Sequence, residues 1–254
     1  MVRLLRTEDL VGAMRLKSAA GWNQTEADWL RLFEFAPEGC FGIDVEGQLA
    51  ATTTAIAYGG QLAWIGMVLT APQLRRQGLA KLLMEHALAY LRERGVRCIK
   101  LDATAMGRPL YERLGFSDEC PVERWVREPG RALWEPAPVQ ETFDAALDLR
   151  AFGADRSQLI AALGHGRPGS EAAYFGPCVA RSERDARAML RSYLGNHAHE
   201  RVFWDLLPGN PRAVELALSH GFVPLRHLTR MRYGDEPVAW DALKVYAIAG
   251  FEFG

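Results

Sequence analysis

An apolar strand, an arginine-rich loop and an amphipathic helix follow one another without interruption over residues 61–94. Residues 62–70 are mostly apolar and are bounded by glycine and proline, which predicts a buried strand. Apolar residues recur at helical spacing over 79–94, so this segment is predicted to be a helix. The loop at 73–80 must therefore join the end of a buried strand to the start of a helix.

The loop has a composition suited to binding an anion. Gly78 and Ala80 are small, so the backbone can approach a ligand closely. The free N–H groups of the first helical turn, with the helix dipole behind them, bind phosphate. Arg75 and Arg76 add charge and forked donors for the same anion. The alternative is a pair of solvated arginines before an ordinary surface helix.

A second motif follows the next predicted strand, residues 96–102. A short helix is predicted there, with Pro109 in its first turn, and it carries Leu-Tyr-Glu-Arg-Leu-Gly-Phe at residues 110–116. This motif, preceded by Arg-x-x-Gly-x-Ala at residues 75–80, resembles the GNAT superfamily of acyl-CoA-dependent N-acyltransferases. The resemblance implies an α/β (α+β) fold with a mixed central sheet and acetyl-CoA as cofactor.

The resemblance also implies roles for individual residues. Val68 and Thr70 would offer backbone partners to the pantetheine arm of the cofactor, and Tyr111 would protonate the leaving thiolate, as a nearby phenol can. The pyrophosphate would be held by the loop residues Arg75, Arg76, Gln77, Gly78, Leu79 and Ala80.

One position departs from the family pattern. Many members place an Asn seven residues before the tyrosine, where this chain has Thr104. The Thr104 hydroxyl could replace that Asn as a donor, or Arg108 could reach the phosphates. The assignment at this position therefore stays open between the two residues.

The acceptor side of the site is implied by the stretch between the first two helices. The resemblance makes Trp22, Asn23 and Trp29 wall residues of an amine pocket; the alternative is that Trp29 packs with Phe33 in the core and Trp22 only fixes the loop. Asp102, at the end of its strand, is the catalytic carboxylate assigned here. Other possible bases near the acceptor loop are Glu26, Asp28 or a water molecule.

Composition limits the class of protein. The chain has 254 residues, is 49% hydrophobic and carries a formal net charge of −1, which predicts a globular protein with one large or two small domains. No charge imbalance favours nucleic acid, and no apolar stretch approaches a membrane span. The cysteines are scattered and no metal site is expected. We expect a cytoplasmic protein without a membrane or nucleic-acid partner.

The chain is predicted to have two domains. Residues 128–141 are rich in proline and lack periodicity, so they are interpreted as a linker. The GNAT domain is then residues 1–127, with its fold complete near residue 127 and its own capacity to bind acetyl-CoA. Residues 142–254 form a second domain.

The second domain is predicted to be a degenerate GNAT-like repeat. A shift of 106 residues lays Phe222 on Phe116, and the same shift replaces Tyr111 by Ala217 and Gly78 by Arg184. This copy would serve as scaffold, dimer surface or wall of the acceptor pocket. Its end, residues 244–253, reads as a buried strand in which Glu252 either faces outward or points between the domains.

The function that follows is acetyl-CoA-dependent transfer of an acetyl group directly to a primary amine of a small molecule. A protein N-terminus or a lysine is the alternative acceptor. A non-catalytic acyl-CoA-binding sensor or structural module is the alternative class, and a homodimer is possible. The identity of the amine does not follow from the residues.

Overall fold

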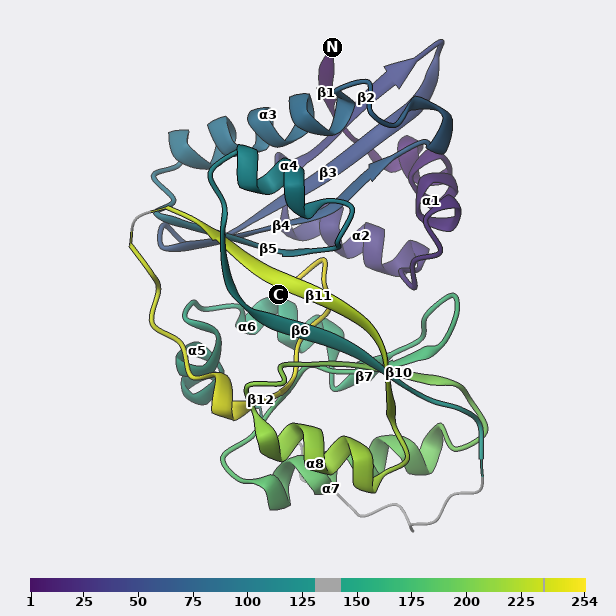
Figure 1. Cartoon of the computed structure of the whole chain (residues 1–254), viewed down its shortest axis with the longest axis vertical. Coiled ribbons are helices and arrows are strands. Elements are labelled where there is room, and N and C mark those ends of the chain that lie inside the picture. The colour runs from purple at the N-terminus through teal and green to yellow at the C-terminus, as the bar shows by residue number, and fades with distance from the viewer. Residues whose placement is uncertain (131–142, 235) are drawn as a thin grey trace.

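The structure of the chain, a computed structural model, describes residues 1–130, 143–234 and 236–254 (Figure 1). The elements before residue 131 are β1 (Val2–Leu4), the 3₁₀ helix η1 (Thr7–Asp9), α1 (Leu10–Ala19), α2 (Glu26–Phe35), β2 (Cys40–Val45), β3 (Gln48–Tyr58), β4 (Leu62–Thr70), η2 (Pro72–Leu74), α3 (Leu79–Glu93), β5 (Cys98–Ala103), α4 (Arg108–Arg113) and β6 (Ser117–Arg127). The elements after residue 142 are α5 (Ala145–Phe152), α6 (Ser157–Leu163), β7 (Gly166–Arg167), β8 (Ala173–Phe175), β9 (Cys178–Val179), α7 (Glu183–Asn196), β10 (Val202–Leu206), α8 (Pro211–Ser219), β11 (Val223–Tyr233), η3 (Ala242–Lys244) and β12 (Val245–Ala247).

Local signals fix several of these boundaries. The Thr25 N–H donates to the Asp28 carboxylate at 2.8 Å, and the Asp28 N–H donates to the Thr25 hydroxyl oxygen at 3.4 Å, so the predicted capping box starts α2. Asn210 accepts a hydrogen bond from the first turn of α8 in the same way. Glu46 and Gly47, with φ of 52° and 74°, form the predicted tight turn between β2 and β3.

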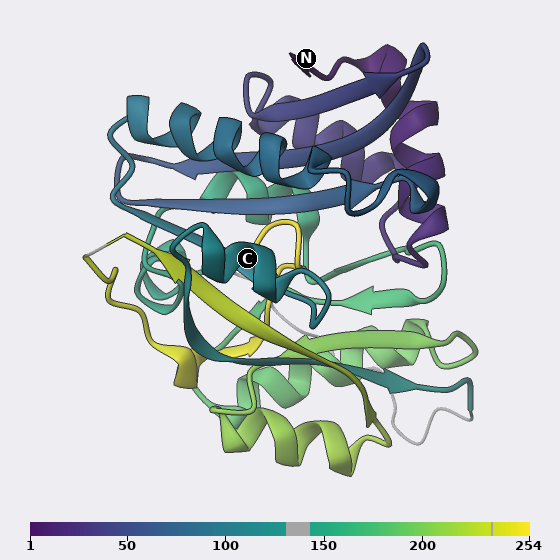
Figure 2. The ribbon, with the colours of Figure 1, turned by 45° about the horizontal axis from the view of Figure 1, so that its top comes forward.

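Among the described residues, ten strands form one mixed sheet in the order β1-β2-β3-β4-β5-β11-β6-β10-β8-β7. The pairs β4–β5 and β8–β10 are parallel, and the other neighbours in this sheet are antiparallel. The elements before residue 131 are here called the first half of the molecule and those after residue 142 the second half. The long antiparallel pair of β6 and β11 joins the two halves (Figures 1 and 2). The predicted α/β fold with a mixed central sheet is confirmed.

The expectation that the first sheet is complete near residue 127 is wrong. β6 pairs with β11 on one edge and β10 on the other, so both neighbours of this strand come from the second half. A strand's sequence pattern shows which face is buried, but it does not identify the strand that fills each edge. The domain boundaries at residues 1–127 and 142–254 remain a prediction, and most of the expected linker at 128–141 lies outside the described residues.

Two apolar cores lie on opposite faces of the first half of the sheet. The first, under α3 and α4, contains Leu83 and Tyr111. The second contains Trp29 from α2 together with Phe152 and Phe253 from the second half. Since one buried cluster includes side chains from both halves, burial of apolar surface stabilises the two halves jointly.

The end of the chain differs from the strand expected at 244–253. Only Val245–Ala247 forms a strand, because the backbone turns at Gly250, where φ is 126°. The following loop is nevertheless buried: Phe253 has no exposed surface, and the Trp64 indole N–H donates to the Phe251 carbonyl at 2.9 Å. The expected burial is therefore confirmed, and the expected regular strand is not.

Two bidentate ion pairs cross between strands of the two halves. Arg230 on β11 donates to both Asp102 oxygens on β5, at 2.9 and 3.0 Å. Arg124 on β6 donates to both Asp205 oxygens on β10, each at 2.7 Å. All four side chains are at most 7% exposed. Burial raises the pKa of Asp102 while Arg230 opposes this shift, so the Asp102 carboxylate depends on Arg230 to remain ionised.

Replacing Arg230 alone is expected to destabilise the fold strongly. Arg230→Met leaves the Asp102 carboxylate buried without a partner, which typically costs about 3–5 kcal/mol of unfolding free energy at neutral pH. The loss should shrink at acidic pH, where Asp102 becomes protonated and neutral. Urea unfolding measures the change, and the double variant Arg230→Met/Asp102→Leu should recover much of it. An Arg230→Met protein as stable as the wild type at neutral pH would contradict this prediction.

Candidate functional site

β4 and β5 run side by side only at their beginning. Their parallel pairing joins Leu62 to Cys98, Ala63 to Ile99 and Trp64 to Lys100, and none follows these pairs in the described part of the chain. Beyond this point β4 continues to Thr70 and bulges where Met67 adopts a φ of 48°. The two strands therefore separate toward their carboxyl ends, as the predicted cofactor cleft requires.

The backbone of β4 is exposed toward that separation. The Ala71 N–H, just after β4, is directed toward the neighbouring strand β3 and donates to the Ala50 carbonyl at 2.8 Å. Successive residues of a strand direct their N–H and C=O groups to opposite edges, so Val68 and Thr70 direct theirs toward β5. Their placement is consistent with the predicted pairing to an extended ligand arm.

The loop before α3 carries unused donors. Arg76 and Gly78 both have positive φ, 63° and 86°, and Gly78 is the N-cap residue of α3. Within the described residues, no backbone hydrogen bond is donated by the N–H groups of residues 76–80. A Cβ placed on Gly78 would meet no protein atom within 4 Å. Successive N–H groups in this conformation form a concave anion site, which fits a pyrophosphate.

Tyr111 is placed by α4 next to the loop after β5. The residue is 8% exposed, and a Cβ added to Gly107 would lie 2.9 Å from its ring and 3.2 Å from its hydroxyl oxygen. No hydrogen bond to this hydroxyl is found among the described residues. Burial raises the pKa of Tyr111 above its ordinary value, so the phenol stays protonated and keeps a proton to donate.

Thr104 and Arg108 make local contacts. The Thr104 hydroxyl oxygen accepts a hydrogen bond from the Gly107 N–H at 3.2 Å and so shapes the turn before α4. Arg108 is bound to Glu112 at 2.9 Å and to Asp118 at 2.6 Å. Because these two carboxylates already pair with the guanidinium, a phosphate would compete with them for Arg108.

Two family models match the chain. Residues 8–116 match one described as the acetyltransferase (GNAT) family, and residues 162–247 match one described as an acetyltransferase (GNAT) domain. The chain belongs to the GNAT acetyltransferase family. Its two GNAT domains lie in tandem, so the repeat expected from the 106-residue shift is a repeat of this domain.

Known proteins resemble this GNAT chain over much of its length. YitH of Bacillus subtilis, an uncharacterized N-acetyltransferase, is 29% identical over 175 residues, which is 63% of this chain and 58% of that protein. A candidate acetyltransferase structure from Pyrococcus horikoshii has a TM-score of 0.85 at 22% identity, covering 100% of this chain and 95% of that one. A GCN5-related N-acetyltransferase from Sphaerobacter thermophilus has a TM-score of 0.66 at 15% identity, covering 95% and 98%. The two structures show a shared fold.

The second GNAT domain lacks the open helix terminus of the first. Ser182 caps α7 with its own side chain, which accepts a hydrogen bond from the Asp185 N–H at 3.3 Å. Glu183 and Asp185 place negative charge in the first turn of this helix. An anion there would meet an occupied donor and two carboxylates, whereas α3 of the first domain has neither a side-chain cap nor an acidic first turn.

Asp102, the predicted catalytic carboxylate of this GNAT protein, is held in a buried ion pair. Its side chain is fully buried, and both oxygens accept hydrogen bonds from Arg230. The sequence places Asp102 at the carboxyl end of β5, but only the pairing of β5 with β11 reveals Arg230 as its partner. We therefore interpret Asp102 as a structural residue.

Of the three expected wall residues, two hold the structure together. Trp29 has no exposed surface and packs on Phe33, with ring centroids 5.9 Å apart, so the structure favours the alternative of a core residue over the wall assignment. Asn23 is also buried; its amide donates to the Ala172 carbonyl at 3.0 Å and its oxygen accepts from the Glu171 and Ala172 N–H groups. Trp22 is partly buried at the same junction.

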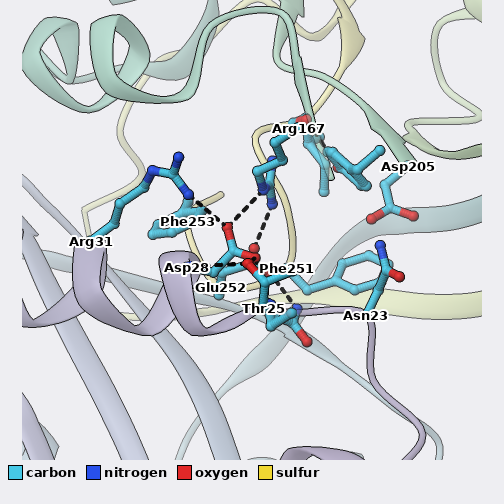
Figure 3. Close-up of polar contacts among 12 residues, drawn as sticks. Asn23, Thr25, Asp28, Arg31, Arg167, Asp205, Phe251, Glu252 and Phe253 are labelled. Carbon is cyan, nitrogen blue, oxygen red and sulfur yellow. Dashed lines mark hydrogen bonds and ion pairs between the residues drawn. The ribbon is translucent and has the colours of Figure 1, made fainter. Parts of the chain in front are cut away.

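A buried polar network that was not predicted from the sequence lies between the two halves (Figure 3). Arg167 on β7 donates to Asp28 on α2 at 2.9 Å and to Glu252 at 2.5 Å. Gln24, before α2, donates to the other Glu252 oxygen at 2.7 Å. The sequence signal for this network was Glu252, a carboxylate within an apolar segment. In the structure its side chain lies between the two halves.

None of the helices among the described residues combines the length and the apolar character needed to cross a membrane.

Proposed function

We propose that this chain catalyses acetyl transfer from acetyl-CoA to a primary amine of a small molecule, with the first GNAT domain as the catalytic one. The observation that carries the proposal is the arrangement of three features: the separation of β4 from β5, the uncapped start of α3 and the protonated Tyr111. The family to which the chain belongs uses acetyl-CoA.

The residues present fit this cofactor. The N–H groups of residues 76–80 have no partner among the described residues and would hold the pyrophosphate, with Arg75 and Arg76 adding charge. Val68 and Thr70 would pair with the extended pantetheine arm through their backbones. Acetyl-CoA supplies an activated acyl group as its thioester.

The chemistry left to the protein is positioning and proton transfer. The amine must be held as the free base so that its lone pair can attack the thioester carbonyl carbon. When the carbon–sulfur bond breaks, the Tyr111 hydroxyl would give its proton to the sulfur, and the phenol would regain a proton from solvent. A side chain kept protonated by burial suits that role.

Measurement of thiol release from acetyl-CoA with a panel of primary amines tests this function. Turnover with an amine that exceeds the rate of hydrolysis supports the enzyme. Acetyl-CoA binding without turnover against a broad panel would favour the non-catalytic sensor instead, and absence of acetyl-CoA binding would overturn both.

Replacing Gly78 is expected to weaken cofactor binding. Gly78→Val introduces a branched side chain where φ is 86° and where the phosphate would approach, so the Kd for acetyl-CoA should rise by about one to two orders of magnitude. Calorimetry should also show one site per chain, because the start of α7 is already capped. Gly59→Val is the matched control, since Gly59 also has positive φ and open space. Two equal sites per chain, or equal effects of the two variants, would contradict the assignment.

A further inference from the structure

Glu252 is a buried carboxylate with two partners from opposite sides. Glu252, Asp28 and Arg167 are at most 6% exposed. The Arg167 guanidinium lies between the two carboxylates, and Arg31 approaches Asp28 at 3.3 Å from a position that is 25% exposed (Figure 3). The fully buried part of the network therefore holds two negative charges and one positive charge.

The backbone of Glu252 lies against β4 beside the place where β4 leaves β5. A Cβ added to Gly66 would be 2.9 Å from the Glu252 Cα and 3.0 Å from its carbonyl oxygen. Gly66 directly precedes the bulge at Met67, and both lie past Trp64, the last residue of β4 that pairs with β5. Glu252 thus stands next to the part of β4 along which the reactive end of the cofactor would lie.

The network around Glu252 has unused capacity to accept hydrogen bonds. Gln24 and Arg167 each donate to one Glu252 oxygen, and the Glu252 backbone N–H also donates to this carboxylate, whose two oxygens can together accept about four hydrogen bonds. The Gln24 side-chain oxygen is buried, and no donor reaches it from the described residues. An ammonium group has three N–H donors and one positive charge. The acceptor capacity that remains on the carboxylate, the Gln24 oxygen and the excess negative charge match that group.

We propose that Glu252 is a catalytic residue that binds the ammonium group of the acceptor, with the Gln24 oxygen as a second acceptor, and removes its proton. This inference rests on the proposed function, because it assigns the base for the same transfer. The acceptor class is a primary amine that arrives protonated.

The proposed step is balanced. One N–H proton of the ammonium group passes to the Glu252 carboxylate, and the freed lone pair forms the bond to the thioester carbon. The carbon–sulfur bond breaks and sulfur takes the Tyr111 proton. The second N–H proton passes through water to the Tyr111 phenolate as the amide forms, and Glu252 releases its proton to solvent, so one proton is released per turnover. Acetylated amine and coenzyme A are the products.

The environment of Glu252 favours proton uptake. Burial raises the pKa of Glu252, while Arg167 lowers it and Asp28 raises it. The other ionisable groups that interact with Glu252 are Tyr58, Tyr174 and Arg124. A base must be deprotonated to act, so activity should be present above the pKa of Glu252 and fall as the pH drops through it.

Glu252→Gln is the direct test. The glutamine keeps the size and an oxygen for Arg167 but cannot take a proton. With butylamine as probe and saturating acetyl-CoA, kcat should fall by about 10²–10³-fold, the acidic limb of the pH profile should disappear and the Kd for acetyl-CoA should stay unchanged. The pKa read from that limb in the wild type should equal the Glu252 carboxyl pKa measured by carbon NMR, which requires no variant.

The matched control is Asp205→Asn, which neutralises another buried, ion-paired carboxylate. It should lower stability and keep the acidic limb.

A binding titration with coenzyme A present completes the test. Butylammonium should bind the wild type at least tenfold more tightly than Glu252→Gln, while tetramethylammonium, which has no N–H donor, should bind the two proteins equally. Equal binding of butylammonium, or an acidic limb that persists in Glu252→Gln, overturns the inference. A wild-type protein that binds butylammonium but releases no thiol overturns the proposed function alone.

Discussion

A chain ending after Arg127 is expected to be unfolded or aggregated and to bind no acetyl-CoA. Its last strand, β6, would have lost both neighbours, since β10 and β11 belong to the second half. Loss of β11 also uncovers one edge of β5 and leaves Asp102 without Arg230. Removal of Phe152 and Phe253 exposes apolar surface of the core that contains Trp29. Each Å² of apolar surface returned to water costs about 25 cal/mol of folding free energy. This prediction replaces the earlier expectation that residues 1–127 bind the cofactor alone.

The control keeps the same residues but breaks the connection between them. Residues 1–130 and 143–254, expressed together as two chains, retain every described strand pairing and should assemble as a one-to-one complex that binds acetyl-CoA. Circular dichroism, mass in solution and calorimetry compare this complex with the fragment and the intact chain. A monomeric 1–127 fragment with native-like spectra and cofactor affinity would show that the shared sheet is dispensable.

Tyr111→Phe is expected to lower kcat by about 10²–10⁴-fold with little change in the affinity for coenzyme A. The phenylalanine ring keeps the packing against Phe116, with centroids 6.0 Å apart, and only the proton donor is lost. No described hydrogen bond of the fold depends on that hydroxyl, so stability should change little. Thiol release under conditions where chemistry limits the rate measures the effect.

Tyr90→Phe is the matched control for this substitution. Tyr90 lies on α3 and is partly buried, and its hydroxyl has no assigned chemical role. It should leave kcat and coenzyme A affinity unchanged. Wild-type turnover in Tyr111→Phe would make Tyr111 a packing residue and place the acid elsewhere. Because burial raises the pKa of Tyr111, a loss of activity that begins at mildly alkaline pH would also argue against this acid.

The sequence by itself determined the features that depend on neighbouring residues. The capping box at Thr25, the turn at Glu46 and Gly47, and the strand, loop and helix around Gly78 all follow from contacts a few residues apart. The motif containing Tyr111 likewise carried the family assignment, which the two matching GNAT models confirm. Short-range geometry sets these elements, so their residue types and spacing are sufficient to predict them.

Tertiary structure decided the features that join distant parts of the chain. Only the folded structure shows that β11 enters the first half of the sheet, that Arg230 pairs with Asp102, and that Trp29 shares a buried core with side chains of the second half. Glu252 meets Gln24 across 228 positions of sequence, and no local pattern encodes that contact. Side chains so far apart meet only after the sheet and cores have formed, because their pairing depends on which surfaces are buried together and not on spacing along the chain.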